Sequence, residues 1–174
     1  MPADAGNAER TGGMKAILMS DSHGDAAGVR WILQQAWART GQVDAYFHMG
    51  DGVMDFRSLE AYLLAHDPEA KLYCVRGNCD FYAPNTESSQ VVTFGGARIF
   101  MTHGHHFQVK TTLELLDEEA DSEYCTIALY GHTHQPAMDM GRTLMINPGS
   151  AQDGRIGFLE VSEGKPRIQL WKFN

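Results

Sequence analysis

The stretch MKAILMSDSHGD, residues 14–25, joins an apolar run to a group of small and polar residues. The run predicts a strand at residues 15–20, and Asp21 and His23 follow directly after its end. Alternate residues of an extended chain point the same way, so Asp21 and His23 are able to reach one metal ion. In α/β sheets, ligands collect beyond the carboxyl ends of the strands. The stretch therefore predicts a strand that delivers two metal ligands to one edge of a sheet.

Four further blocks repeat this pattern of an apolar run, a small residue and a polar residue. They are MGDG with Asp51, RGNCD with Asn78, THGHH with His103, and YGHTHQP with His132 and His134. Each block alone is also explained by a turn, a helix cap or a packed histidine. Five blocks in one chain predict instead that seven ligands meet at one place. Carboxylate, imidazole and amide ligands suit two divalent transition ions better than one structural zinc, so metal-assisted hydrolysis is the first hypothesis.

The order of elements predicts a mixed two-sheet core flanked by helices. The first half alternates strands at 15–20, 44–49 and 71–75 with helices at 26–39 and 56–66, and Asp25 is the expected N-cap of the first helix. The second half is rich in strands, expected at 90–94, 98–102, 126–130, 136–140, 143–146, 155–161 and 167–173, with one helix at 111–120.

Length and composition indicate one soluble domain, because 174 residues with 43% hydrophobic content bury a sizeable core. We expect residues 14–174 to form that domain and the small, polar residues 1–13 to form a disordered tail. No apolar run approaches the ~20 residues of a membrane helix, and the N-terminus has no signal-peptide pattern. We therefore expect a cytoplasmic protein without membrane contact, and the three cysteines fit reduced thiols.

The charge balance disfavours nucleic acid as a partner. The formal net charge is −8, and the 14 lysines and arginines form no run. Nucleic-acid binders need a basic face, because neutralisation of phosphates supplies most of their affinity. A small phosphorylated substrate remains compatible with an acidic chain, because bound divalent ions reverse the local potential.

Taken in order, the blocks resemble a known family. The motifs are Asp-x-His, Gly-Asp, Gly-Asn-Cys-Asp, His-Gly-His, Gly-His-Thr-His and Asn-Pro-Gly-Ser. From about residue 14 to the C-terminus, the chain resembles the calcineurin-like metallophosphoesterase superfamily and is most similar to its small single-domain phosphodiesterases of the YfcE type. The resemblance implies an α/β fold, a four-layer αββα sandwich of two mixed β-sheets flanked by helices.

The same resemblance implies a dinuclear metal site. It assigns one ion to Asp21, His23, Asp51 and His134, and the other to Asp51, Asn78, His103 and His132. Asp51 is then the bridging ligand, and a water or hydroxide between the ions is the expected nucleophile. Mn²⁺ is the favoured ion, with Fe, Ni or Zn left open, because sites of oxygen and nitrogen ligands discriminate weakly among these metals.

Two further residues bear on the substrate. Many phosphatases of the superfamily carry a histidine after the asparagine, where it is thought to protonate the leaving group, but this chain has Cys79. A thiol is a poor general acid for an alkoxide, and the YfcE-type proteins also have this cysteine and favour diesters. We therefore expect a phosphodiesterase for small diesters with good leaving groups. His105, in the His-Gly-His motif, is the second catalytic candidate, although a structural role stays open.

Several alternatives remain at this stage. A phosphomonoesterase with the same site is opposed by Cys79, and a protein-binding scaffold of the same fold is opposed by the complete ligand set. A nuclease-type relative would be expected to carry extra domains and a basic surface. The sequence leaves open the natural substrate, the metal, the formation of a homo-oligomer, and whether Arg155 or the turn at residues 147–150 contacts phosphate.

Overall fold

Two five-stranded sheets pack face to face in the computed structural model, which describes residues 12–174. The first sheet has the order β10-β9-β1-β2-β3 and the second β4-β5-β6-β8-β7. The strands of the first sheet are β1 (Met14–Met19), β2 (Ala45–His48), β3 (Lys71–Cys74), β9 (Arg155–Ser162) and β10 (Lys165–Lys172). Those of the second are β4 (Ser89–Phe94), β5 (Ala97–Thr102), β6 (Ile127–Leu129), β7 (Pro136–Met140) and β8 (Leu144–Pro148). The tail expected at residues 1–13 falls almost wholly on residues 1–11, which lie outside the described part.

Both sheets are mixed, as expected. In the first sheet β1, β2 and β3 are parallel, while β9 runs antiparallel to both β1 and β10. In the second sheet β5, β6 and β8 are parallel, and β4 and β7 are antiparallel edge strands. The parallel strands matter most for function, because their carboxyl ends meet at one edge of each sheet.

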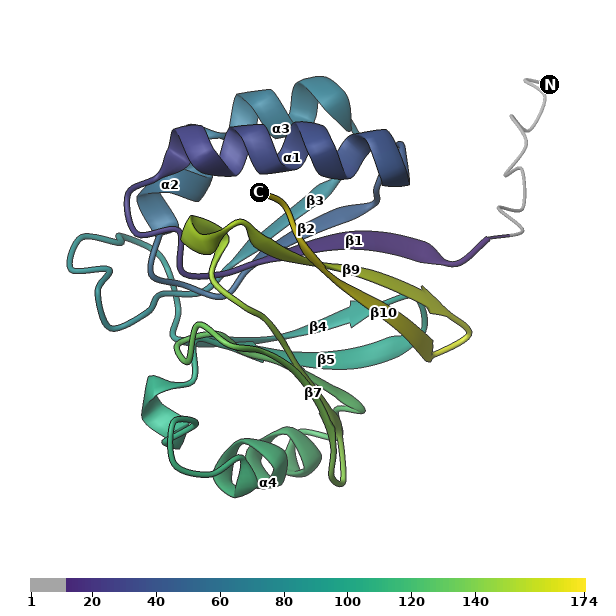
Figure 1. Cartoon of the computed structure of the whole chain (residues 1–174). Coiled ribbons are helices and arrows are strands. Elements are labelled where there is room, and N and C mark those ends of the chain that lie inside the picture. The colour runs from purple at the N-terminus through teal and green to yellow at the C-terminus, as the bar shows by residue number, and fades with distance from the viewer. Residues whose placement is uncertain (1–11) are drawn as a thin grey trace, which may run out of the picture.

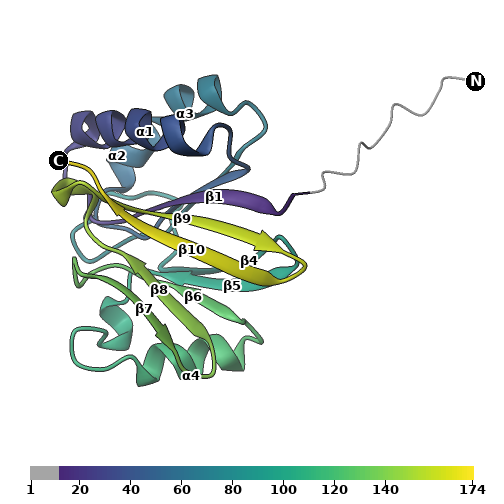
Figure 2. The ribbon, with the colours of Figure 1, turned by 45° about the vertical axis from the view of Figure 1, so that its right-hand side comes forward.

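Helices cover the outer face of each sheet, so the four-layer αββα sandwich is confirmed (Figure 2). The first sheet carries α1 (Ala26–Thr40), α2 (Val53–Ser58) and α3 (Glu60–His66), and the second carries α4 (Glu114–Ser122). Two short 3-10 helices, η1 (His105–Phe107) and η2 (Ala151–Asp153), lie in loops. Within the described part, no helix is long and apolar enough to cross a membrane.

The central strands β1 and β2 are apolar on both faces because both faces are buried. In β1, Leu18 packs between the two sheets, while Ile17 packs against the helices of the first sheet. In β2, Phe47 likewise packs between the two sheets, while Tyr46 packs against the helices of the first sheet. The near-continuous apolar runs of the sequence thus place β1 and β2 in the middle of the sandwich and leave their ends for polar chemistry.

Two predicted helices differ from the structure. The helix expected at 56–66 is two helices, α2 and α3, which meet at Leu59. Residues 53–55 join α2 because a distant carboxylate, that of Asp80, accepts the N–H of Val53. The helix expected at 111–120 begins at Glu114, where the Thr112 hydroxyl accepts the first N–H. Asp25 caps α1 as expected, accepting the N–H of Gly28 at 2.9 Å.

Candidate metal centre

All seven predicted ligands lie in loops that follow the carboxyl ends of parallel strands. Asp21 and His23 follow β1, Asp51 follows β2, Asn78 follows β3, His103 follows β5, and His132 and His134 follow β6. These loops emerge on one side of the sandwich, the left side of Figure 1. Their aspartate and histidine side chains form neighbouring groups, and within each group the possible ligand atoms lie within 4.8 Å of one another.

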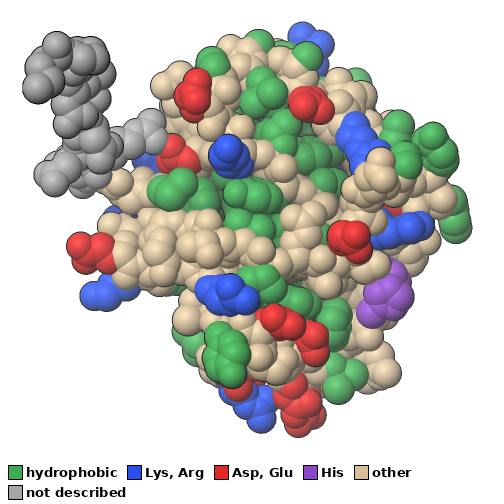
Figure 3. All heavy atoms as spheres, turned by 180° about the vertical axis from the view of Figure 1, so that it is seen from behind, with side chains coloured by type: hydrophobic (Ala, Val, Ile, Leu, Met, Phe, Trp, Pro, Cys, Tyr) green, Lys and Arg blue, Asp and Glu red, His purple; other side chains and the backbone are tan. Residues whose placement is uncertain are grey.

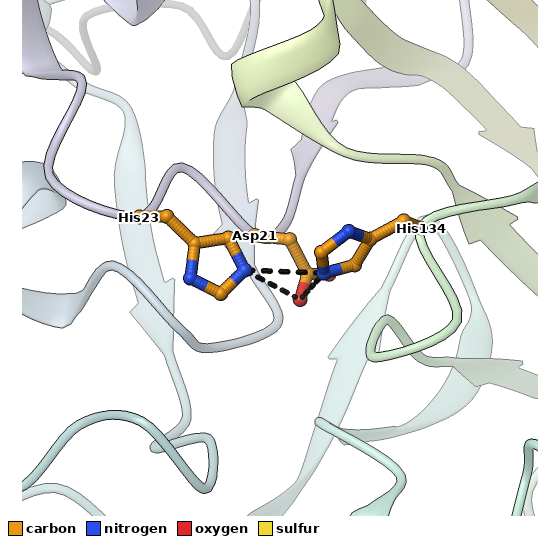
Figure 4. A group of neighbouring side chains, drawn as sticks. All are labelled: Asp21, His23 and His134. Carbon is orange, nitrogen blue, oxygen red and sulfur yellow. Dashed lines mark hydrogen bonds and ion pairs between the residues drawn. The ribbon is translucent and has the colours of Figure 1, made fainter.

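The first group consists of Asp21, His23 and His134 (Figure 4). The Asp21 Oδ1 atom lies 3.2 Å from His134 Nε2 and 3.5 Å from His23 Nε2, and the two nitrogens are 3.1 Å apart. This Oδ1 is buried and has no hydrogen-bond partner in the described part of the chain. The other oxygen, Oδ2, accepts the Ser20 hydroxyl and the His132 N–H. A buried carboxylate oxygen without a donor is costly, and a cation between these three side chains would satisfy it.

The second group surrounds the Nε2 atom of His103. That nitrogen lies 3.2 Å from Asp51 Oδ2, 3.1 Å from Asn78 Oδ1 and 3.2 Å from His132 Nδ1. The other ring nitrogen of His103, Nδ1, is 2.7 Å from the Met49 carbonyl oxygen. A carbonyl oxygen only accepts hydrogen bonds, so Nδ1 must carry a proton and donate it. Neutral His103 therefore keeps its proton on Nδ1 and presents the lone pair of Nε2 to the group, the arrangement of a metal-ligating imidazole.

Asp51 lies between the two groups. Its Oδ2 atom is 3.2 Å from His103 Nε2 and 3.9 Å from His23 Nε2. Its Oδ1 atom accepts the backbone N–H of Cys79 at 2.8 Å, which fixes the direction of the carboxylate. One oxygen that faces both groups is the geometry that a bridging ligand needs.

Backbone strain is concentrated at the same residues. Five predicted ligands have left-handed φ angles, namely Asp21 (54°), His23 (47°), Asp51 (55°), His132 (69°) and His134 (60°). Such a conformation costs free energy for a residue other than glycine, and it persists only where the surroundings fix it. Strain of this kind clusters at functional sites, which supports a functional role for these loops.

Asp80 holds the Asp51 loop in this conformation. Its carboxylate accepts four backbone N–H groups, from Asp51 (2.7 Å), Gly77 (2.7 Å), Gly52 (2.9 Å) and Val53 (3.0 Å). The loops after β2 and β3 are thereby tied together at one side chain. The sequence pattern includes Asp80 in RGNCD but gives no sign of this role, because most of its partners lie 27 to 29 residues away.

A buried polar chain supports the Asp21 and His23 loop. The Gly50 N–H donates to Nδ1 of His48, so the other nitrogen, Nε2, carries the proton and donates to the Ser22 hydroxyl at 3.1 Å. Ser22 in turn donates to Asp55 at 2.7 Å, and Asp55 also accepts the N–H of Gly24. Burial lowers the pKa of His48 to about 4 against the opposing charge of Asp80, so the ring is neutral and this direction is fixed. Ser22 and Asp55 are further positioning residues that no local motif indicates.

The turn at residues 147–150 supports the site from the other side. Asn147 Nδ2 donates to the Gly131 carbonyl oxygen and to the Thr133 hydroxyl, which orders the loop that carries His132 and His134. The Ser150 hydroxyl donates to the Asp21 carbonyl oxygen at 2.8 Å. Both side chains are fully buried. Their polar groups therefore hold neighbouring loops.

The side chains of the two groups shift one another's pKa values. Although burial acts the other way, the hydrogen bonds from protonated His103 and from the Cys79 N–H hold the pKa of Asp51 well below its usual range. Burial also opposes the charged form of His103, but the carboxylates of Asp51 and Asp21 outweigh it and raise the pKa of that imidazole. Burial and the neighbouring His103 lower the pKa of His132. An anionic Asp51 beside imidazoles is the state that binds divalent cations.

The two candidate catalytic residues lie at the rim of these groups. Cys79 is exposed, and its thiol falls within 4.8 Å of possible ligand atoms of His23 and Asp51. Partial desolvation of the sulfur by neighbouring groups and the negative charge of Asp51 raise the pKa of this exposed thiol. The His105 ring lies 5.4 Å from the His103 ring, and its Nδ1 atom is buried without a hydrogen-bond partner among the described residues. Burial and the neighbouring His106 lower the pKa of His105 to about 4.

The residues present thus fit two divalent cations. The first group offers an unpartnered carboxylate oxygen with two imidazoles, and the second offers an imidazole lone pair with a carboxylate and an amide oxygen. This mixture of oxygen and nitrogen ligands is typical of transition ions in hydrolytic sites.

Comparison with known proteins places the chain in a family. The model of the calcineurin-like phosphoesterase superfamily domain matches residues 14–160. The chain is 32% identical over 146 residues to the probable metallophosphoesterase YsnB of Bacillus subtilis (strain 168), a match that covers 82% of this chain and 78% of YsnB. It is 34% identical over 88 residues to the phosphodiesterase YfcE of Escherichia coli (strain K12), which covers 46% of this chain and 44% of YfcE.

A solved structure agrees with these matches. The crystal structure of a conserved predicted phosphoesterase from Streptococcus pneumoniae TIGR4 has a TM-score of 0.70 with this chain at 30% sequence identity. The match covers 91% of this chain and 89% of that chain. The protein therefore belongs to the calcineurin-like phosphoesterase superfamily, as a small metallophosphoesterase similar to YsnB and YfcE.

Proposed function

We propose that the protein hydrolyses small phosphodiesters with the help of two divalent metal ions, with Mn²⁺ as the favoured ion. The observation that carries the proposal is the position of Asp51 Oδ2, which faces His103 of one ligand group and His23 of the other. Asp21, His23 and His134 would hold one ion, and Asn78, His103 and His132 the other, with Asp51 shared. When bound, such ions supply the positive charge that activates water and stabilises the charge developing on phosphoryl oxygens.

The protein's own residues position these groups. Asp80 and the His48–Ser22–Asp55 chain hold the strained loops, so the ligand atoms are placed before substrate arrives. The Met49 carbonyl oxygen fixes the tautomer of His103. His105, near His103 and His132, is suited to contact the phosphoryl group as a neutral hydrogen-bonding residue.

The preference for diesters rests on Cys79 and is supported by the name of a relative. Cys79 occupies the exposed rim beside Asp51, where a strong general acid would be needed to protonate a poor leaving group. A thiol is a weak donor, so substrates that leave without protonation are favoured. YfcE, which matches about half of this chain, is named a phosphodiesterase.

The test is a substrate panel with the purified, Mn²⁺-supplied protein. We expect turnover of bis(4-nitrophenyl) phosphate, slower turnover of 4-nitrophenyl phosphate, and very little turnover of an alkyl monoester. An Asp51→Asn variant should lose all three activities. Preferred turnover of the alkyl monoester would establish the monoesterase alternative, and no turnover with metals bound would favour a protein-binding scaffold.

A further inference from the structure

A pocket of about 420 Å³ opens directly beside the candidate metal centre. One part of its lining belongs to the centre or its rim, namely His23, Asp51 and Cys79. Another part is apolar and comes from Met54, Phe81 and Tyr82. The volume lies within the range of small-molecule sites, roughly 300–1,000 Å³. A molecule bound at the metal centre therefore has room to extend toward the apolar part.

The apolar side chains of this pocket are unusually exposed. The exposed fraction is 90% for Phe81, 73% for Tyr82 and 50% for Met54. Single exposed apolar residues are ordinary, but three that line one pocket mark a binding surface. Figure 3 shows hydrophobic side chains gathered along the same edge of the molecule as an exposed histidine.

The loop that carries the two aromatic residues is fastened at both ends. At its start, the Asp80 carboxylate accepts four backbone N–H groups, and the Asp80 carbonyl oxygen accepts Arg76 Nη2 at 3.2 Å. At its end, Arg57 Nη2 donates to the Pro84 carbonyl oxygen and the Thr86 hydroxyl, both at 2.5 Å. The loop is thus fixed without burying either ring. When a flat group stacks on the rings, only the two side chains and not the loop backbone must lose freedom, which favours binding.

The charges around the pocket restrict what it can accept. Its lining includes the carboxylates of Asp51, Asp55 and Asp80 and no lysine or arginine. With ions at the centre, one phosphate group is attracted there, but additional phosphates extending toward the aromatic residues would meet only negative charge. The remainder of the ligand should therefore carry no further negative charge.

We propose that Phe81 and Tyr82, with Met54, form a binding subsite for an uncharged planar aromatic group, an aryl ring or a nucleobase, that is esterified to the phosphate. This inference rests on the proposed phosphodiesterase function and names its substrate class: small diesters with a flat aromatic substituent. Stacking on aromatic side chains tolerates different ring systems because every such ring offers a π face. The subsite thus selects for a flat shape and against further negative charge.

Binding of diesters to the Mn²⁺-loaded protein tests the inference apart from turnover. Calorimetric titration would compare dimethyl phosphate, diphenyl phosphate and the methyl ester of thymidine 5′-phosphate, with ³¹P NMR to verify that each ester stays intact. We expect at least one planar ligand to bind about 5- to 100-fold more tightly than dimethyl phosphate, the range that stacking supplies. The tighter of the two planar ligands identifies the source of the ring as aryl or nucleobase.

Matched variants assign that preference to the two rings. In the double variant Phe81→Ala/Tyr82→Ala the preference should fall to about threefold or less, while Phe81→Tyr and Tyr82→Phe should retain it. Tyr124→Ala removes an equally exposed ring (85%) outside the pocket and should leave the preference unchanged.

Two results would overturn the subsite. One is the absence of any preference for planar ligands in the unmodified protein. The other is an unchanged preference in the double variant. If light scattering also showed that this variant had lost a dimer, Phe81 and Tyr82 would instead form a contact with a second copy of the chain. Hydrolysis of bis(4-nitrophenyl) phosphate is measured separately, so either result can occur while the proposed function stands. Conversely, a planar preference without any hydrolysis would contradict the proposed function alone.

Discussion

The carboxylate of Asp80 accepts the backbone N–H of Asp51 at 2.7 Å, which joins two loops at the centre of the candidate site. Asp51 has a left-handed φ of 55°, so its carboxylate stays in place only while the loop is held. The same Asp80 side chain accepts three further N–H groups, two of them at the start of α2. Asp80 thus links the start of α2, the ends of β2 and β3, and the predicted metal ligand Asp51.

Asp80→Asn should weaken both the fold and the site. An amide keeps one acceptor oxygen and places an NH₂ group against two backbone donors, so two buried N–H groups lose their partner. We expect a loss of about 2–6 kcal/mol in the free energy of unfolding, at 1–3 kcal/mol for each of the two lost partners. Urea unfolding and Mn²⁺ titration would measure both effects. Asp153→Asn, at an exposed carboxylate, is the control, and equal behaviour of the two variants would refute the anchoring role.

The sequence predicts the ligands far better than their supports. Every strand end that carries a predicted ligand lies where an apolar run ends in the sequence. An apolar run of this kind is stable only as a strand buried on both faces, so its end marks the end of the strand. The supports have no such signature. Ser22 and Asp55 are 33 residues apart, and only the packing of α2 against the first loop brings them together.

The boundaries of the helices show the same limit of prediction from local sequence. Helix α2 begins three residues before the predicted start because its first N–H groups bond to Asp80, a residue of a later loop. A local pattern of apolar residues does not contain that contact. The apolar pocket wall was equally hidden, since Phe81 and Tyr82 look like ordinary loop residues until the fold places them beside the centre.

Asp117 should make part of the stability depend on pH. It ties α4 to the turn between β7 and β8 by accepting the N–H groups of Arg142 and Thr143 and the Thr143 hydroxyl. Although burial opposes it, these bonds hold the pKa of Asp117 below its usual range. A depressed folded pKa gives stability that is present above the unfolded value, near ~3.9, and lost as pH falls through the folded value.

Replacement of Asp117 by Asn should therefore remove this pH-dependent part. At pH 7 we expect a loss of about 1–3 kcal/mol. Between pH 4 and pH 2, urea unfolding of the unmodified protein should lose stability more steeply than unfolding of the variant. Asp121→Asn, at an exposed residue of the same helix, serves as control. Parallel pH curves for Asp117→Asn and the unmodified protein would contradict the assignment.

Protons should compete with metal at His103. The charges of Asp51 and Asp21 raise the pKa of this imidazole despite its burial, and a metal ligand must give up the proton on its binding nitrogen. Mn²⁺ affinity should therefore begin to fall at a higher pH than the ordinary histidine value of ~6.5. Titrations at pH 8, 7, 6 and 5 would measure this. A constant affinity from pH 8 to pH 5 would show that His103 is not a ligand.

Cys79→His should shift the substrate preference toward monoesters. An imidazole at this rim position can protonate a leaving group, and a well-placed general acid contributes ~10²–10⁴-fold. The gain should be at the low end of that range, because the surrounding residues were not shaped for an imidazole. The ratio of monoester to diester turnover is the measurement, with Cys79→Ser as the control for size. A ratio unchanged from that of the serine variant would point to another proton source, with His105 as the first residue to replace.

The metal content of the protein tests the central claim most directly. The protein should be saturated with Mn²⁺ and freed of excess Mn²⁺ by gel filtration. Elemental mass spectrometry then gives the number of manganese ions bound per chain. Two ligand groups that share Asp51 predict close to two ions per chain, and Asp51→Asn, which removes one carboxylate oxygen from the shared position, should retain no more than one while staying folded. A stoichiometry of one in the unmodified protein, or two in Asp51→Asn, would contradict the dinuclear centre.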